Sequence, residues 1–428
     1  MESKKSHIQK KVELKCDIHS SLSCISTELN EELERENINN IECISSKNTP
    51  KVENKDKILV CAAHFYPHVG GYEKYILELY SRITEQFEVY ILVSDFEKNP
   101  IFEVYNELNI VRLDSWCLLG NTYPIPKISI KNYKTLKKIL NNDYLFINTH
   151  TRFFFMSLLG YIISKIKKTE LIHTEHGIGT AVYNNKTVET SSYIYDKTLG
   201  PLIVRGSKFT IGISKASEDF LKKLGSKKSF IIPNCVDTSN FCEKQSHLKS
   251  SLNINKNSTI ITFVGRLTYP KGVQDLIQAF YILEKKKLDL KLLIVGDGSY
   301  LSKLQKIVDN NPNIIFLGKR NDIPEILNIT DIFVNPSHYE GLPTSVLEAA
   351  SVGVPIVATN VGGTKEMFIK EMGYLVDEKD PNGLAISIKK IIDNKSKVNP
   401  KMSREHILKN YCWQKKSTEF IQIIKDNF

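Results

Sequence analysis

Two glutamates with seven residues between them could bind a polar ligand in this sequence. Glu340 lies in a loop that follows the apolar run at residues 332–335, and Glu348 lies in the helix pattern after that loop. Pro343 suits the first turn of this helix, so Glu348 falls about one and a half turns from its N-terminus. Both carboxylates can then reach a ligand held on the free N–H groups of the first turn. A carboxylate that accepts two hydroxyl hydrogen bonds suits a sugar or a ribose.

Two cations follow another apolar run. Gly265-Arg266-Leu267 ends the run at residues 260–264, and Lys271 comes five residues after Arg266. Cations fixed at the carboxyl end of a strand can hold a diphosphate, because arginine offers a planar fork and lysine a point charge. Two solvated cations in a loop are the alternative interpretation.

Glycines follow two further apolar runs. Gly70 and Gly71 come after residues 58–63 and open a helix pattern, where glycines let the backbone approach a ligand and leave N–H groups free for a phosphate. An ordinary tight turn is the alternative. Gly296-Asp297-Gly298 looks like a dinucleotide fingerprint, but Leu301 occupies the third glycine position, which argues against a nicotinamide cofactor.

One histidine, His176, lies just past the apolar run at residues 170–173. It either acts beside a ligand or satisfies a local carbonyl group, and the second role is the more common one for a loop histidine. We give the structural interpretation outright to five other residues, which are His64, His68, His150, Trp116 and Trp413.

Apolar runs alternate with helix patterns along most of the chain. The runs lie at residues 58–63, 89–93, 110–113, 144–147, 170–173 and 209–213, and then at 260–264, 291–295, 314–317, 332–335, 355–358 and 374–376. Strands that alternate with helices predict a parallel sheet covered on both faces. Two such series predict two doubly wound domains, at residues 57–228 and 229–410. Ligands bind outside the carboxyl ends of such strands, which places the site in the cleft between the domains.

The composition argues against several other classes of protein. The 428 residues are 41% hydrophobic and 25% charged, which is typical of globular proteins and excludes collagen-like and wholly disordered chains. Residues 1–56 contain no Phe, Tyr or Trp and predict a polar, disordered N-terminal extension. The apolar run at 153–166 is shorter than the ~20 residues of a membrane span, and the polar N-terminus does not look like a secretory signal.

The eight cysteines are scattered without Cys-x-x-Cys spacing, which favours reduced thiols in a cytoplasmic protein over a zinc site or disulfides. The net charge of +10 includes lysine clusters at residues 131–138 and 165–168. Solvated helix faces are one explanation, and peripheral contact with an anionic membrane or an acidic acceptor is another. Apart from Tyr133, no aromatic residue is interleaved with these clusters, and no recognisable nucleic-acid-binding module appears, so we expect no nucleic-acid partner.

Five motifs resemble family 4 of the retaining glycosyltransferases. They are Tyr66-Pro67-His68-Val69-Gly70-Gly71-Tyr72-Glu73, Ile232-Pro233-Asn234-Cys235-Val236-Asp237, Gly265-Arg266-Leu267 with Lys271-Gly272, Val295-Gly296-Asp297-Gly298, and the run from Glu340 to Glu366. Their order and spacing match from residue 57 to about residue 415. One departure is Cys235, which replaces the usual glycine of its motif, and we expect it to strain or reshape one loop.

The resemblance implies the GT-B fold, an α/β architecture of two Rossmann-like doubly wound parallel-sheet domains that face each other across a cleft. It also implies that residues 411–428 form a helix crossing back to the first domain. The donor would be a nucleoside-diphosphate-sugar, bound mainly by the second domain. On that analogy Arg266 and Lys271 hold the diphosphate, the Gly70-Gly71 loop closes on it, and Glu348 binds the ribose hydroxyls.

The resemblance also implies contacts to the transferred sugar. Glu340 and the backbone of Gly341 and Leu342 would contact this sugar, and His176 would lie beside it on the acceptor side. The sequence has no Asp-x-Asp motif, so we expect no metal or other cofactor. Retention of configuration could come from a covalent intermediate or from same-face attack. We favour same-face attack, because by analogy Glu340 is better placed to hold hydroxyls than to attack the anomeric carbon.

The leading hypothesis is therefore transfer of a sugar from a UDP- or GDP-sugar to a hydroxyl of a glycan or lipid-linked acceptor. The process would be cell-surface polysaccharide or glycolipid synthesis, in the cytoplasm or on the cytoplasmic face of the membrane. The first domain, with loops such as residues 178–192, would select the acceptor. Two alternatives remain open, a non-catalytic GT-B protein that binds nucleotide and a nucleotide-sugar epimerase.

Overall fold

The computed structural model describes residues 55–428 except 69, 119–122, 180–192, 287 and 394–397. Lys55–Phe428 forms one compact unit. The extension expected at residues 1–56 lies outside the described residues, except for Lys55 and Asp56.

The first part of the chain builds a sheet in the order β3-β4-β2-β1-β6-β7-β8-β9, with β5 paired to β4. Its strands are β1 (Asp56–Ala62), β2 (Phe87–Asp95), β3 (Phe102–Tyr105), β4 (Leu108–Leu118), β5 (Tyr123–Pro126), β6 (Phe146–His150), β7 (Glu170–Glu175), β8 (Phe209–Gly212) and β9 (Ser229–Ile231). The pairs from β4 through β9 along this order are parallel. β3 and β5 run antiparallel to β4.

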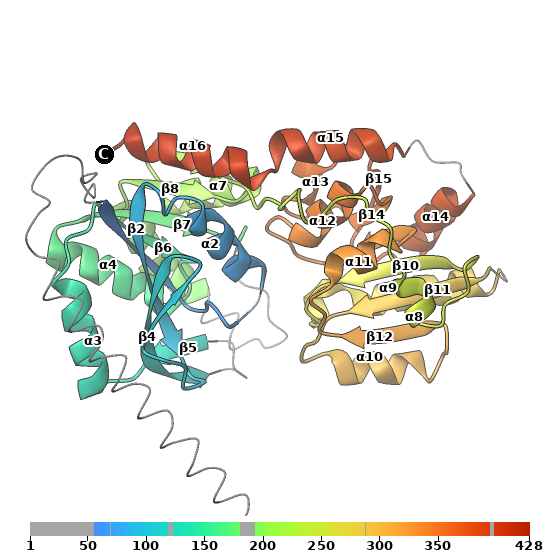
Figure 1. Ribbon diagram of the computed structural model, residues 1–428, viewed down its shortest axis with the longest axis horizontal. Helices are drawn as coiled ribbons and strands as arrows, with labels where there is room; N and C mark the ends of the chain where they lie inside the picture. The colour runs from blue at the N-terminus through green and yellow to red at the C-terminus, as the bar shows by residue number, and fades with distance from the viewer. Residues whose placement is uncertain (1–54, 69, 119–122, 180–192, 287, 394–397) are drawn as a thin grey trace, which may run out of the picture. The chain divides into compact units, whose positions relative to one another are not determined.

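Helices follow most of these strands, as Figure 1 shows. They are α2 (Gly71–Ser81), α3 (Ile130–Leu140), α4 (Phe155–Lys167), α6 (Leu199–Gly206) and α7 (Lys215–Leu224). The C-terminal helix α16 (Trp413–Lys425) also packs on this part of the chain. Its Trp413 and Phe420 rings contact Tyr75 and Tyr80 of α2, with ring centroids 5.3 and 6.0 Å apart.

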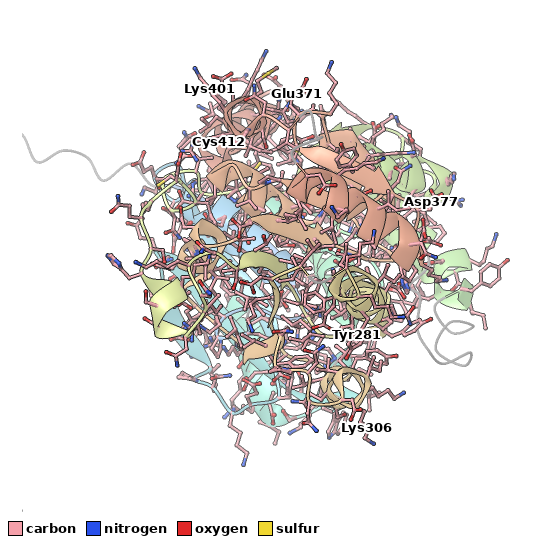
Figure 2. The ribbon with its side chains drawn as sticks, turned by 90° about the vertical axis from the view of Figure 1, so that its right-hand side faces the viewer. Tyr281, Lys306, Glu371, Asp377, Lys401 and Cys412 are labelled. Carbon is pink, nitrogen blue, oxygen red and sulfur yellow. The ribbon has the colours of Figure 1, made fainter. Side chains whose placement is uncertain are left out.

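The second sheet has the order β12-β11-β10-β13-β14-β15, and its pairs are parallel. Its strands are β10 (Thr259–Val264), β11 (Leu290–Val295), β12 (Ile314–Gly318), β13 (Ile332–Asn335), β14 (Ile356–Thr359) and β15 (Gly373–Val376). The connecting helices are α8 (Leu248–Ser251), η1 (Tyr269–Lys271), α9 (Val273–Glu284), α10 (Leu301–Val308), α11 (Ile323–Asn328), α12 (Thr344–Val352), α13 (Thr364–Met367), α14 (Pro381–Ile392) and α15 (Pro400–Asn410). The hydroxyl of Tyr281 in α9 donates to the Val308 carbonyl of α10 (2.8 Å), which joins these two helices. Figure 2 labels Tyr281 and, on α10, Lys306.

Capping residues set several helix boundaries. The Ser214 hydroxyl accepts from the Ser217 N–H at the start of α7, and Gly225 ends this helix with a left-handed φ of 101°. The Ser129 hydroxyl accepts from the Asn132 N–H at the start of α3. Helix α3 therefore begins at Ile130.

The predicted α/β class and the two sheets of parallel strands are confirmed. The expectation of wholly parallel sheets is wrong for the first one, because β3 and β5 add antiparallel strands to β4. β9 pairs with β8, so the first sheet reaches residue 231, three residues past the boundary expected at 228.

The loop with Cys235 shows no left-handed backbone. Cys235 is buried, its thiol donates to the Pro233 carbonyl (3.4 Å), and it is not among the described residues with positive φ. The described cysteines, which are Cys61, Cys117, Cys235, Cys242 and Cys412, are free thiols. None of the helices in the described part of the chain combines the length and the apolar character needed to cross a bilayer.

Candidate active site

Glu340 lies in the loop between β13 and α12, and only 8% of its surface is exposed. The Lys271 Nζ atom lies 2.6 Å from its Oε1 atom, and the Ser337 hydroxyl donates to the same oxygen at 2.7 Å. Lys271 belongs to η1, which follows the neighbouring parallel strand β10. The two residues therefore meet because both follow adjacent parallel strands at their carboxyl ends.

Gly272 allows this meeting. Its φ is +66°, and a Cβ atom at this position would lie 1.9 Å from the Pro336 carbonyl oxygen. The His338 N–H donates to the Pro270 carbonyl (2.7 Å) and ties the Glu340 loop to the turn with Lys271. The His338 Nε2 atom also lies 2.6 Å from the Asp275 carboxylate of α9.

Arg266 is exposed just beyond the end of β10. The Leu267 N–H beside it donates to the Asp297 carbonyl (2.8 Å), which joins this loop to the loop after β11. Cβ atoms at Gly296 and Gly298 would lie 1.9 and 2.4 Å from carbonyl oxygens of the Arg266 loop. The two glycines of the Gly-Asp-Gly pattern therefore allow two loops to approach each other closely. This packing role accounts for glycine at both positions without a dinucleotide.

Glu348 of α12 has a lysine partner that the sequence analysis did not identify. Its Oε1 atom lies 2.5 Å from the Nζ atom of Lys74, in the first turn of α2. Burial alone would lower the pKa of Lys74, but the charge of Glu348 and this hydrogen bond raise it above its usual value. The Lys74 ammonium also lies 4.9 Å from the centre of the Phe241 ring. A Cβ atom on Gly71 would lie 3.7 Å from the Thr344 hydroxyl, so the Gly70-Gly71 segment reaches the start of α12.

The segment Gly341-Leu342 lies against the first part of the chain. A Cβ atom at Gly341 would lie 2.4 Å from the His176 carbonyl oxygen, so only glycine allows this approach. The Asn234 amide donates to the Leu342 carbonyl (2.6 Å), and the Gly363 N–H donates to the Gly341 carbonyl (3.0 Å). Within the described residues, no hydrogen bond is recorded for the N–H groups of Gly341 and Leu342.

His176 is half-buried beside this segment, and its Nε2 atom lies 3.0 Å from the Nδ1 atom of His150. The His150 Nε2 atom lies 3.1 Å from the Tyr80 hydroxyl. Burial lowers the pKa of His176 to about 3 and holds the pKa of His150 well below its usual value, so both rings are neutral near pH 7. His150, interpreted from the sequence as structural, thus lies between the Tyr80 hydroxyl and the His176 ring.

A buried ion network supports the segment that carries His176. Arg152 contacts the carboxylates of Glu175 (2.8 Å) and Asp196 (2.9 Å) and donates to the Gly179 carbonyl (3.0 Å). The Gly177 N–H donates to Glu175 (2.8 Å). Burial alone would raise the pKa of Glu175, but the charge of Arg152 holds it well below its usual range.

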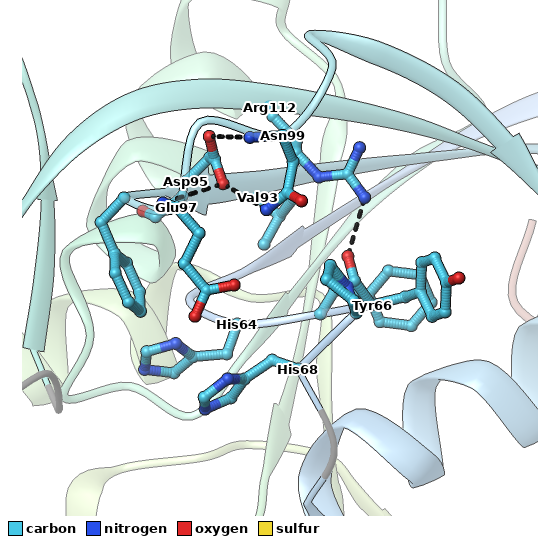
Figure 3. Close-up of a pocket in the computed structure, with 12 residues that line it drawn as sticks. His64, Tyr66, His68, Val93, Asp95, Glu97, Asn99 and Arg112 are labelled. Carbon is cyan, nitrogen blue, oxygen red and sulfur yellow. Dashed lines mark hydrogen bonds between the residues drawn. The ribbon is translucent and has the colours of Figure 1, made fainter. Parts of the chain in front are cut away.

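The rest of the loop expected to select the acceptor, residues 180–192, lies outside the described residues. Its first part contacts the Glu340 loop, since the Ile178 N–H donates to the Tyr339 hydroxyl (3.1 Å). His64 and His68, interpreted as structural from the sequence, line a cavity beside the first sheet that Figure 3 shows. Among the described residues, no group of three or more His, Cys, Asp or Glu side chains is arranged to hold a metal ion.

Comparisons with known proteins identify the family and the fold. Residues 69–240 match the family described as Glycosyltransferase Family 4, and residues 244–409 match Glycosyl transferases group 1. An uncharacterized glycosyltransferase of Methanocaldococcus jannaschii is 31% identical over 87% of this chain and 98% of its own length.

Another relative is UDP-Gal:alpha-D-GlcNAc-diphosphoundecaprenol alpha-1,3-galactosyltransferase of Escherichia coli, which is 27% identical over 79% of this chain and 89% of its own length. Among solved structures, HepE of Anabaena in complex with UDP-glucose superposes with a TM-score of 0.70 at 18% identity, covering 86% of this chain and 99% of that one. The protein therefore belongs to family 4 of the glycosyltransferases and has the GT-B fold.

Proposed function

We propose that this glycosyltransferase moves a sugar, with retention, from a UDP- or GDP-sugar to a hydroxyl of a glycan or lipid-linked acceptor. The observation that carries this proposal is the ion pair between Lys271 and Glu340, on loops that follow adjacent parallel strands, in a segment whose Gly341 approaches the His176 backbone. The E. coli relative, whose name gives UDP-Gal as donor and a diphosphoundecaprenol-linked sugar as acceptor, supports cell-surface polysaccharide or glycolipid synthesis.

In this proposal each group of the site contacts one part of the donor. Lys271 and the exposed Arg266 hold the diphosphate, with Gly70 and Gly71 closing on it, and Glu348 accepts the ribose hydroxyls. Glu340 and the N–H groups of Gly341 and Leu342 contact the transferred sugar. His176 lies beside that sugar as a neutral ring.

The proposed chemistry is same-face attack without a metal. Lys271, Arg266 and the N–H groups at the start of α12 stabilise the negative charge that develops on the leaving diphosphate. The leaving phosphate takes the proton of the acceptor hydroxyl. Glu340 is engaged by Lys271 and Ser337, which supports a role in holding hydroxyls rather than in attack on the anomeric carbon.

We further propose that the protein works in the cytoplasm, in peripheral contact with an anionic membrane. Residues around the start of α3 support this contact. Ile128, Ile130 and Tyr133 are 99%, 76% and 68% exposed. Lys131, Lys134, Lys137 and Lys138 are exposed on the same helix. Exposed apolar side chains among lysines suit the surface of an anionic bilayer.

Salt-sensitive binding of the protein to anionic vesicles is expected, and absence of this binding would contradict the proposed membrane contact.

A panel of UDP- and GDP-sugars, scored by release of the nucleoside diphosphate, tests the main proposal. Each donor is incubated with and without diphosphoundecaprenol-linked GlcNAc as the trial acceptor. We expect release with one donor, and a loss of about 100-fold or more in Glu340→Gln and Arg266→Ala. Glu85→Gln and Lys285→Ala, at exposed positions just before β2 and just after α9, serve as matched controls.

Each alternative gives a distinct result in this panel. Full activity in the Glu340 or Arg266 variant would overturn the site. Production of an altered sugar nucleotide without any acceptor would identify an epimerase. Binding of a nucleotide without turnover of any donor would identify a non-catalytic protein.

A further inference from the structure

Four buried polar side chains form a chain of hydrogen bonds that ends at His176. Asn148 and His150 lie on the same face of β6. Thr174 lies on the neighbouring strand β7, and Tyr80 lies on α2. None of these four residues is more than 1% exposed. Polar groups buried this deeply depend on one another for hydrogen bonds.

The Asn148 amide sets the direction of this chain. Its oxygen accepts from the Thr174 hydroxyl (3.1 Å), and its NH₂ group donates to the Tyr80 hydroxyl oxygen (2.6 Å). The Tyr80 hydroxyl also has one hydrogen to donate. Within the described residues, the only acceptor recorded for this hydrogen is the Nε2 atom of His150, which lies 3.1 Å from the Tyr80 oxygen. We therefore infer that Nε2 of His150 accepts.

The same reasoning passes from His150 to His176. Burial holds the pKa of His150 well below its usual value and lowers the pKa of His176 to about 3, so near pH 7 each ring carries one hydrogen. Because Nε2 of His150 accepts from Tyr80, the hydrogen of His150 lies on Nδ1. This Nδ1 atom lies 3.0 Å from Nε2 of His176, which must then accept. The hydrogen of His176 is therefore on its Nδ1 atom.

The Nδ1–H group of His176 is free for a ligand. Among the described residues, no hydrogen bond is recorded for this Nδ1 atom. The other ring nitrogen is occupied by His150. A ring in this state can donate a hydrogen bond to a ligand, but it has no free nitrogen with which to take up a proton.

We propose that Asn148, Tyr80 and His150 are positioning residues that fix the tautomer of His176, so that His176 donates a hydrogen bond to an oxygen of the transferred sugar and does not act as a base. This inference rests on the proposed function, which places His176 beside that sugar. The proton of the acceptor hydroxyl then goes to the leaving phosphate, as in the proposed same-face attack.

Solid-state NMR on the full chain tests the tautomer directly. The protein carries histidine that is isotopically labelled at the ring carbon and nitrogen atoms, and the signals of His176 are identified by their loss in His176→Ala. We expect the hydrogen of His176 on Nδ1 near pH 7. A hydrogen on Nε2 would overturn the inference, because the chain of hydrogen bonds would then run in the opposite direction.

Two substitutions on α2 test whether the chain fixes this tautomer. Tyr80→Phe removes the donor to Nε2 of His150, so we expect a second tautomer of His176 to appear in the spectrum. Tyr75→Phe is the matched control, because its ring also lies close to the His176 ring (4.8 Å) but its hydroxyl donates to the Ile232 carbonyl (3.2 Å). This control should keep the hydrogen of His176 on Nδ1. Identical His176 signals in the two variants would overturn the positioning role.

Turnover of the donor tests whether Tyr80 acts through His176. In Tyr80→Phe, kcat should fall about tenfold, the equivalent of one hydrogen bond. The KM of the donor should stay nearly constant, because the contacts proposed for the diphosphate and the ribose are kept. In a His176→Ala background, Tyr80→Phe should cause little further loss. An equal loss in both backgrounds would show that Tyr80 does not act through His176.

The tautomer measurement needs no turnover, which separates failure of this inference from failure of the proposed function. A protein that turns over a donor but carries the hydrogen of His176 on Nε2 would overturn this inference alone. A protein that carries it on Nδ1 but turns over no donor would contradict the proposed function, and with it the role of His176 as a donor to the sugar.

Discussion

Glu340 and Glu348 are each paired with a lysine, and the two residues are only 8% and 7% exposed. A buried carboxylate needs such a partner, because removing it from water is costly. A donor would bring its own charged diphosphate and its hydroxyls into the same place. The lysines therefore offset the cost of burying the two carboxylates, whose oxygens can accept hydrogen bonds from hydroxyl groups.

Replacement of Lys271 should affect both stability and turnover. Lys271→Ala leaves Glu340 with Ser337 as its remaining partner, and we expect a loss of about 1–3 kcal/mol in the free energy of unfolding. Release of the nucleoside diphosphate should fall about 100-fold or more. Urea unfolding and the donor panel measure the two effects. Lys285→Ala should change neither, and a fully active Lys271→Ala would contradict the diphosphate assignment.

The neutral pair His150 and His176 makes stability depend on pH. Both rings stay unprotonated in the folded protein because burial lowers their pKa, whereas histidines of the unfolded chain take up protons below about pH 6.5. The free energy of unfolding should therefore fall as the pH drops below 6.5, by about 1.4 kcal/mol per pH unit for each histidine. Glu175, whose pKa is held low, adds a separate loss only below about pH 4.5.

Urea unfolding at pH 7.5, 6.5 and 5.5 checks this dependence. His150→Gln removes one of the two titrating rings, so its stability should fall less steeply between pH 6.5 and 5.5 than that of the unsubstituted protein. Equal slopes in the two proteins would show that His150 is protonated in the folded state.

Helix α16 supports the site through aromatic packing rather than through polar contacts. Trp413 is 1% exposed and lies against Tyr75, whose ring lies 4.8 Å from the ring of His176. The Trp413 Nε1 atom has no hydrogen-bond partner among the described residues. The contribution of this side chain is therefore mainly its apolar volume.

Two substitutions of Trp413 should separate the contribution of its ring volume to stability from the contribution of its indole N–H group. Trp413→Ala leaves a cavity under Tyr75 and should cost about 3–5 kcal/mol of unfolding free energy. Trp413→Phe keeps most of the ring and loses no hydrogen bond, so it should cost clearly less than Trp413→Ala. Thermal unfolding of both variants measures the difference. Equal losses would show that the indole N–H, rather than the ring volume, is required.

The strands that bear the site could be predicted because they are short apolar runs buried on both faces. β3 could not, since its burial alternates and Phe102 and Val104 are exposed. Lys271 and Glu340 could be assigned to one site only through the family resemblance, because the strands that precede their loops, β10 and β13, are adjacent in the sheet but not consecutive in the sequence. Lys74 and His150 could not be paired with their partners, because these contacts depend on how helices and loops from different strands meet, which no local spacing encodes.

The pair Lys74 and Glu348 joins α2, next to the first sheet, to α12, next to the second. Other contacts join the same parts of the chain, including the Glu366 carboxylate, which accepts from the N–H groups of Lys215 and Ala216 at the start of α7. Glu348 is also the group proposed to hold the donor ribose. Its pairing with Lys74 therefore links the packing of the two sheets to the donor site.

A double-mutant cycle on Lys74 and Glu348 measures this link in the whole molecule. Lys74→Met and Glu348→Gln should each destabilise the protein, because each leaves a partner poorly solvated and unpaired. The double variant should be less destabilised than the sum, with a coupling of roughly 1 kcal/mol or more in urea unfolding. The pair Lys416 and Glu419, neighbours on α16, serves as a control for a contact within one helix, where a coupling of only about 0.3–0.5 kcal/mol is expected. A coupling near zero for Lys74 and Glu348 would mean that α2 and α12 do not hold this contact in solution, and Glu348 would then be free to bind the ribose without displacing a lysine.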